Sequence, residues 1–382
     1  MINKIVQDNQ AEFRGAALLR VMALISLLYF FLLAIAMMGG AFKTFGKDFA
    51  ELLIASTTNP VVGLMIGLLA TSLIQSSSGT TSIVVGLVAA GALDVPNAVP
   101  IIMGANMGTT VTNTVVALGS MNRKAEFRRA FAGATVHDFF NLMTIGILFP
   151  LEMATGYLQK TATWLSSVFI GSEGLEFQSP IKAIVKPPVK MFKHWLTDGF
   201  ELNTTISGII MLTVAMILLF GALALLTKLM RRVVVSRAEG AFSRNLKNNS
   251  LMGMALGMIV TVLVQSSSIT TSLMVPLVGS GILTLEAVFP VTLGANIGTT
   301  VTALLAAMTG NVAAVTVAFV HLLFNISGIL LIYPFKPIRR IPIRLARLLA
   351  LRTSEDKRWA AYYLLGIFFI MPLTFVMISK MF

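Results

Sequence analysis

The chain has 382 residues, of which 56% are hydrophobic and 12% are charged, and it carries a net charge of +13 with no cysteine. This composition excludes an ordinary soluble domain, and the lack of thiols excludes disulfides and cysteine-ligated metals. We therefore predict an all-α polytopic membrane protein surrounded by the lipid bilayer.

Seven apolar segments are each about as long as the twenty residues that a bilayer-crossing helix needs. In chain order they are residues 16–42, 98–119, 130–150, 204–230, 288–309, 312–335 and 359–379. The first segment lacks a small-residue cleavage pattern, so we expect a retained span and not a signal peptide. The basic residues cluster between the segments, which favours the positive-inside rule and not a nucleic-acid partner as their explanation.

An internal repeat relates the two halves of the chain. A shift of 190 positions aligns residues 61–120 with 251–310, and roughly 26 of the 60 pairs are identical. Three motifs recur in the same order, namely LIQSSSGTTS from Leu73 with LVQSSSITTS from Leu263, GANMGTTVT from Gly104 with GANIGTTVT from Gly294, and HDFFN from His137 with HLLFN from His321.

The segments around the two QSSS stretches are too short to cross a membrane. Each apolar arm of roughly fifteen residues reaches about 22 Å, whereas the hydrocarbon core is about 30 Å thick. We therefore predict re-entrant helical hairpins at 60–93 and 251–285, each with QSSS at its tip and shielded by protein. The two GAN motifs predict broken helices at 98–119 and 288–309, although their glycines can also be simple kinks.

The predicted domains follow from counting the crossings. They are a cytoplasmic N-terminus (1–15), a first inverted repeat (16–150), an extracytoplasmic linker (151–203), a second inverted repeat (204–335), a basic cytoplasmic segment (336–358) and a C-terminal transmembrane helix (359–382). The two hairpins then enter the membrane from opposite sides, as in many secondary transporters. The basic segment is expected to lie as an amphipathic helix on the anionic inner leaflet.

The serine-rich hairpin tips are typical of an anion site. A helix that begins at the tip presents unpaired N–H groups and the positive end of its dipole, while serine and glutamine side chains add donors. Two such tips would surround one oxyanion with Gln75, Ser76, Ser77, Ser78, Gln265, Ser266, Ser267 and Ser268. The alternative is that these side chains only cap the hairpins and allow close helix packing.

Oxygen-bearing side chains in and after the GAN motifs are typical of a sodium site. Hard oxygen ligands without several carboxylates suit Na⁺ better than a divalent cation or a transition metal. The candidate ligands are Asn106, Thr109, Asn296, Thr299 and Thr302, together with Thr114, Asp138 and Asn141 in the first half.

The two halves differ where the first keeps extra polar side chains. Asn113, Thr114 and Asp138 are replaced in the second half by Ala303, Leu304 and Leu322. Asp138 is the only acid well inside a predicted span and shares a helical face with Asn141, so the pair is a candidate cation site, with a structural role for Asp138 as the alternative. For His137 and His321, each four residues before an asparagine, a packing role is favoured.

Taken together, the paired QSSS stretches, GANMGTTVTNTVVAL and EFRRAFAGATVHDFFN closely resemble the type II sodium-dependent inorganic phosphate cotransporter family over most of residues 15–335. The resemblance implies that both QSSS stretches contribute to phosphate and sodium binding, with Gln265, Ser266, Thr299 and Thr302 at one sodium site. It also implies a second sodium site at Thr114 and Asn141, and an electrogenic type because of Asp138. The short outer segment without cysteine favours a bacterial member.

We therefore expect sodium-driven uptake of inorganic phosphate across the cell membrane by alternating access, with Na⁺ as the coupling ion and no cofactor. A sodium-coupled carrier of another oxyanion or of a carboxylate is the main alternative, and an anion channel is a weaker one. We expect no enzyme, because neither QSSS stretch has an activating base beside it.

Overall fold

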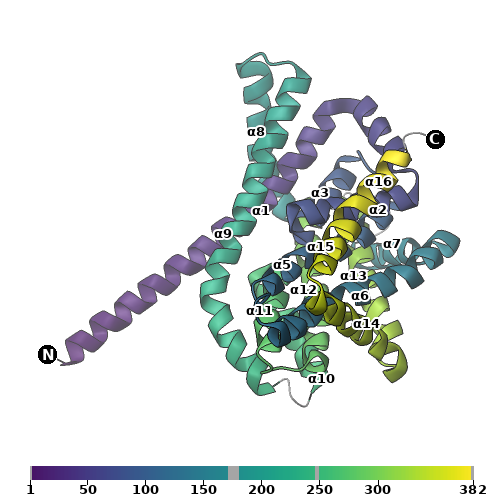
Figure 1. The fold of residues 1–382 in the computed structure, drawn as a ribbon. Coiled ribbons are helices and arrows are strands. Elements are labelled where there is room, and N and C mark those ends of the chain that lie inside the picture. Colours follow the sequence, from purple (N-terminus) through teal and green to yellow (C-terminus); the bar gives the residue numbers. More distant parts are fainter. Residues whose placement is uncertain (1, 171–179, 246–248, 380–382) are drawn as a thin grey trace.

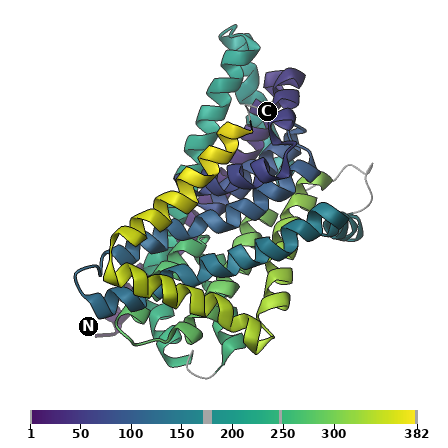
Figure 2. The ribbon, with the colours of Figure 1, turned by 45° about the vertical axis from the view of Figure 1, so that its right-hand side comes forward.

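The computed structural model describes residues 2–170, 180–245 and 249–379, and its regular elements there are all helices (Figures 1 and 2). The first half contains α1 (Ile2–Thr57), α2 (Pro60–Ile74), α3 (Ser77–Ala90), α4 (Val95–Met107), η1 (Gly108–Thr110), α5 (Val111–Leu118), α6 (Lys124–Thr155) and α7 (Tyr157–Ile170). The remainder contains α8 (Pro180–His194), η2 (Trp195–Gly199), α9 (Thr204–Asn245), α10 (Ser250–Val264), α11 (Ser267–Gly279), α12 (Leu285–Ala307), α13 (Val312–Ile332), α14 (Lys336–Glu355), α15 (Arg358–Leu365), η3 (Gly366–Ile370) and α16 (Met371–Ile378). Parts of four predicted stretches lie outside the described residues, namely residue 1 of the N-terminus, 171–179 of the linker, 246–248 of the second repeat and 380–382 of the C-terminal helix.

Seven described helical segments are long and apolar enough to cross a membrane, and each coincides with a predicted span. They are Leu18–Gly46, Val95–Leu118, Lys124–Thr155, Thr204–Arg231, Leu285–Ala307, Val312–Ile332 and Arg358–Ile378. The prediction of an all-α polytopic membrane protein is confirmed. It could be made from sequence because hydropathy and segment length are the properties that a bilayer selects.

Each QSSS stretch separates two short helices. α2 ends at Gln75, whose backbone is left-handed (φ 59°), and α3 begins after Ser76. The second stretch repeats this turn, with Gln265 at φ 56° and Ser266 before α11. A left-handed conformation is uncommon for a residue other than glycine, so its presence in both copies indicates one shared turn geometry. Entry of the two hairpins from opposite membrane faces stays a prediction.

Glycines allow the first arm of each hairpin to lie against the next span. A Cβ atom at Gly104 would lie 1.9 Å from the carbonyl oxygen of Leu64, and one at Gly294 would lie 1.8 Å from that of Met254. Only glycine fits at such distances, so α2 packs backbone to backbone on α4, and α10 does the same on α12.

The two GAN motifs differ in backbone structure. In the first half, the 3₁₀ turn η1 separates α4 from α5, so the predicted break at 98–119 is present. In the second half, α12 runs without interruption from Leu285 to Ala307, and the break predicted within 288–309 is absent from the structure. The glycines of α12 allow its close approach to α10. An interior glycine lowers the stability of a helix by only about 1 kcal/mol relative to alanine, and packing can offset this loss.

The two halves interlock through the second arm of each hairpin. α3 packs against α12 and α13 of the second half, whereas α11 packs against α5 and α6 of the first. The helices that begin at the two QSSS tips therefore each lie among elements of the other repeat.

Two further groups of helices lie against this core. α1 and α9 run side by side, α8 lies against α1, and the N-terminal end of α1 extends away from the other helices (Figure 1). The basic segment forms α14, which runs beside α6 (Figure 2). Its buried residues include Ile343, Ala346 and Ala350, whereas Leu348 is exposed. Much of the apolar face of α14 is thus covered by protein. Only its exposed side chains are left for the expected contact with lipid.

Candidate functional site

The first hairpin tip is tied to the broken span of its own half. The Gln75 Oε1 atom accepts a hydrogen bond of 2.7 Å from the Thr112 hydroxyl, while its Nε2 atom donates to the carbonyl oxygen of Ser72 at 2.5 Å. The Ser76 hydroxyl caps α3 by accepting from the amide of Gly79 at 3.1 Å. Gln75 and Ser76 therefore have structural partners in this conformation.

The second tip repeats the arrangement. The Gln265 Oε1 atom accepts from the Thr302 hydroxyl at 2.7 Å, its Nε2 atom donates to the Val262 carbonyl, and Ser266 accepts from the Ile269 amide at 3.4 Å. Gln265, Ser266 and Thr302, which the family resemblance implies belong to one sodium site, are thus close together. Thr112 was missed by the sequence analysis, although its alignment with Thr302 was a signal that could have identified it.

The other four serines are buried and have free hydroxyls. Ser77, Ser78, Ser267 and Ser268 are 4%, 4%, 3% and 8% exposed. No hydrogen bond joins their hydroxyls to any residue that the structure describes. They lie in the first turns of α3 and α11, where main-chain N–H groups also lack helical partners. Each tip therefore offers hydroxyl and amide groups that can donate hydrogen bonds to an anion.

A network of histidines and asparagines crosses between the two halves. His137 Nε2 lies 2.5 Å from Asn296 Oδ1, and His321 Nε2 lies 3.2 Å from Asn106 Oδ1. Asn141 extends the network, because its Nδ2 atom donates to the Asn106 carbonyl at 3.0 Å. All five residues are at most 3% exposed. The side-chain oxygens of Asn106 and Asn296 are therefore already engaged in this conformation.

Asp138 faces the C-terminal helix and not the asparagine network. Its Oδ2 atom accepts a hydrogen bond of 2.6 Å from the Tyr363 hydroxyl, while Oδ1 has no partner among the described residues. Asn141, by contrast, accepts from Asn296 Nδ2 at 3.0 Å. Asp138 and Asn141 thus bind different partners and share no hydrogen bond, so their expected joint site is not assembled here. Tyr363 lies 225 positions along the chain, and no sequence pattern signalled it.

The remaining predicted sodium ligands are buried threonines. Thr114 donates to the Thr110 carbonyl at 3.2 Å and Thr299 donates to the Ala295 carbonyl at 3.0 Å, which leaves lone pairs on both hydroxyl oxygens. Thr109 is 2% exposed and its hydroxyl bonds to no described residue.

Asn113 makes the clearest difference between the halves. Its Oδ1 atom accepts from the hydroxyls of Thr271 at 3.1 Å and Ser272 at 2.9 Å on α11. The aligned position in the second half is Ala303, and the aligned hydroxyls, Thr81 and Ser82, are buried without a partner among the described residues. The contact joins α5 to the second hairpin and has no equivalent at the first.

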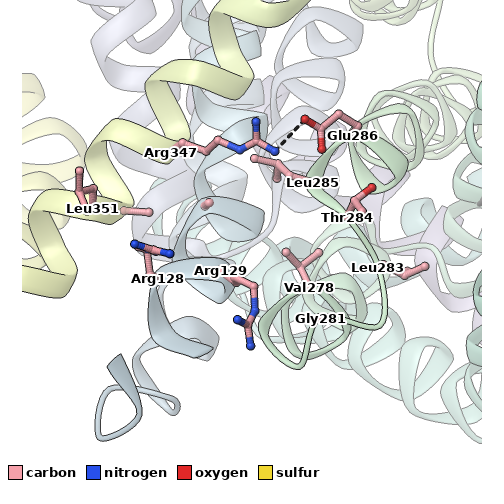
Figure 3. Close-up of a pocket in the computed structure, with 12 residues that line it drawn as sticks. Arg128, Arg129, Val278, Gly281, Leu283, Thr284, Leu285, Glu286, Arg347 and Leu351 are labelled. Atoms are coloured by element: carbon pink, nitrogen blue, oxygen red, sulfur yellow. Dashed lines mark hydrogen bonds and ion pairs between the residues drawn. The ribbon is translucent and has the colours of Figure 1, made fainter. Parts of the chain in front are cut away.

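The pocket in Figure 3 lies away from these residues. It measures about 460 Å³ and is lined by Arg128, Arg129, Arg347 and Glu286 among others, but by none of the predicted phosphate or sodium ligands. Arg347 points toward Glu286 and pairs with it at 2.7 Å (Figure 3). This pocket therefore does not mark the anion site.

The seven candidate spans of the described residues, packed around buried polar side chains, define an integral membrane protein. The chain matches the Na⁺/Pi-cotransporter family over residues 30–176 and 217–350, and it belongs to that family. This is a family of transporters and not of enzymes.

Curated relatives show the same similarity. The chain is 35% identical to sodium-dependent phosphate transport protein 2A of Rattus norvegicus over 94% of its own length and 67% of the relative. It is 33% identical to sodium-dependent phosphate transport protein 2B of Homo sapiens over 93% of its length and 64% of the relative. The chain thus spans about two thirds of the length of these relatives. No solved structure matches it.

Proposed function

We propose that this protein takes up inorganic phosphate together with Na⁺ across the cell membrane. The observation that carries the proposal is the pair of hairpin tips, each with two buried serine hydroxyls that no described residue satisfies. Family membership supports the same cargo, since the relatives are named sodium-dependent phosphate transport proteins.

The phosphate ligands are assigned to the two QSSS stretches. Ser77 and Ser78 of α3, with Ser267 and Ser268 of α11, donate hydroxyl groups, and the positive ends of both helices favour the charge. Gln75, Ser76, Gln265 and Ser266 already have partners, so they shape the tips and join the site by exchanging those partners. Hydrogen bonds to a charged group contribute about 1.5–3 kcal/mol each, so a few can hold an anion without a buried arginine.

The sodium ligands are assigned to oxygens beside the tips. Gln265, Ser266, Thr299 and Thr302 form one site, and Thr114, Asp138 and Asn141 form a second after Asp138 turns from Tyr363. Asn106, Thr109 and Asn296 complete the oxygen-rich surroundings. Na⁺ bound there would balance the negative charge of phosphate, which explains why the two would travel together.

Alternating access follows from the internal repeat. With a cytoplasmic N-terminus, the first hairpin enters from outside and the second from inside, which places the shared site near the midplane. The crossed His137–Asn296 and His321–Asn106 contacts join the two repeats, so we propose that they rearrange when one repeat moves against the other.

Uptake into liposomes that contain only the purified protein tests the proposal. We expect saturable phosphate uptake that requires an inward Na⁺ gradient, at rates far below channel flux. Sulfate, arsenate and dicarboxylates serve as competitors, and preferential transport of one of them would reassign the cargo. Flux without saturation or without Na⁺ dependence would refute coupled transport.

A further inference from the structure

A pocket between α1 and α8 is unusually basic. It measures about 310 Å³ and is lined by five lysines and no acidic residue, and the lysines are Lys43, Lys182, Lys186, Lys190 and Lys193. Four of them follow one another along α8 at intervals of three or four residues, so they share one helical face (α8 is labelled in Figure 1).

The charge of this pocket is not compensated within the described part of the protein. None of the five lysines forms an ion pair with a described residue. Like charges four residues apart destabilise a helix, so the cluster has a cost that a bound anion would offset. The arginine pocket of Figure 3 differs, because Glu286 there pairs with Arg347.

The pocket lies at the ends of the helices that lead to the first hairpin tip and the second GAN motif. Its lining includes Ala89 near the end of α3 and Thr309 just beyond α12. Ala89 follows Ser77 by twelve residues of helix, a rise of about 18 Å. In the proposed topology both ends face outside. The positive-inside rule disfavours lysines on the outer side of the membrane, so it does not explain this cluster of five.

We propose that the lysine pocket is an external vestibule that captures phosphate before it reaches the hairpin tips. The inference rests on the proposed function and on its topology. A positive cavity raises the local concentration of anions and their rate of association, and it favours HPO₄²⁻ over H₂PO₄⁻ because attraction grows with charge. Lysines act as hydrated point charges and hold phosphate loosely, as a capture site must.

The test measures initial rates of phosphate uptake in liposomes for the double variant Lys186→Gln/Lys190→Gln. At constant Na⁺ and an ionic strength of about 0.01 M, we expect its KM for phosphate to rise about tenfold with an unchanged maximal rate. Near 1 M ionic strength, the difference from the wild type should disappear, because the Debye length falls to about 3 Å. The variant Lys186→Arg/Lys190→Arg keeps the charge and should keep the KM. Lys160→Gln, which removes a lysine of the linker that does not line the pocket, should also leave it unchanged.

Three results would overturn the vestibule. The first is an unchanged KM for phosphate in the glutamine variant, and the second is an increase in this KM that persists at high salt. The third is an increase in KM that is lost in liposomes of neutral lipid, which would show that the lysines bind lipid headgroups. Absence of sodium-dependent uptake in the wild type would instead refute the proposed function, so the two failures are distinguishable.

Discussion

Replacing Asp138 by asparagine tests whether this carboxylate couples a sodium ion to transport. Asp138 is 1% exposed, and its Oδ2 atom accepts the Tyr363 hydroxyl at 2.6 Å. Asparagine has nearly the same shape and its Oδ1 can accept that hydrogen bond, so the Asp138→Asn protein should fold. What it removes is the negative charge that would balance a bound Na⁺.

The expected effect is a loss of charge movement. If three Na⁺ accompany HPO₄²⁻, one net positive charge enters per phosphate, and this is worth about 2.3 kcal/mol at 100 mV. Without the Asp138-dependent Na⁺, the charges of two Na⁺ and HPO₄²⁻ cancel. At 100 mV, the variant should therefore lose about fiftyfold in the phosphate accumulation that the voltage can drive.

The assay records current and radiolabelled phosphate uptake in the same liposomes or cells. We expect about one charge per phosphate for the wild type and close to none for Asp138→Asn. Tyr363→Phe is the matched control, because it removes the hydrogen bond but keeps the carboxylate, and it should keep the charge per phosphate. An Asp138→Asn protein that transports with an unchanged ratio of charge to phosphate would refute the reasoning.

Three further predictions concern the tips, the asymmetry and the packing. Ser268→Ala should raise the KM for phosphate by roughly tenfold or more, through loss of a donor to a charged ligand, whereas the exposed Ser280→Ala should not; equal uptake curves for the two would exclude Ser268 as a ligand. Asn113→Ala should lower the free energy of unfolding by about 1 kcal/mol, because it removes the acceptor of the half-buried Ser272 hydroxyl while Thr271 keeps its bond to the Ser267 carbonyl, and Ala303→Asn should raise thermal stability by supplying the missing acceptor; the opposite signs would contradict the alignment of the halves. Gly294→Ala should prevent folding or strongly lower the unfolding temperature, because its Cβ would lie 1.8 Å from a carbonyl oxygen, and a variant of normal stability would show that α10 and α12 can separate.

Hydropathy was sufficient to predict the seven spans, whereas α7 and α8 of the linker were not predicted. The two QSSS turns were also foreseeable, since a short apolar arm on each side of a polar tetrapeptide leaves few alternatives. The break at 288–309 was not correctly predicted because glycine has two uses in a membrane helix. The residue pattern at Gly294 is the same for a kink as for a close helix contact, and only the position of α10 distinguishes them.

The site was predictable to the extent that it repeats. The pairing of Gln75 with Thr112 follows from that of Gln265 with Thr302, but the partner of Asp138 does not follow from any motif. Tyr363 comes from a helix outside the repeats, and its contact depends on how that helix docks. The hydrogen-bond partners of the histidines and asparagines across the two halves likewise depend on the tertiary structure. The bacterial source expected from the short linker stays a prediction.

The crossed histidine–asparagine contacts also bear on how such a chain could have arisen. His137 of the first half binds Asn296 of the second, and His321 of the second half binds Asn106 of the first. Two identical copies of a single repeat, related by a two-fold axis, would exchange this same pair of bonds, because each copy would supply one histidine and one asparagine. The contact therefore suits a dimer of half-length ancestors whose genes were later fused. Once both halves were on one chain, they were free to differ, as they now do at Asn113 and Ala303.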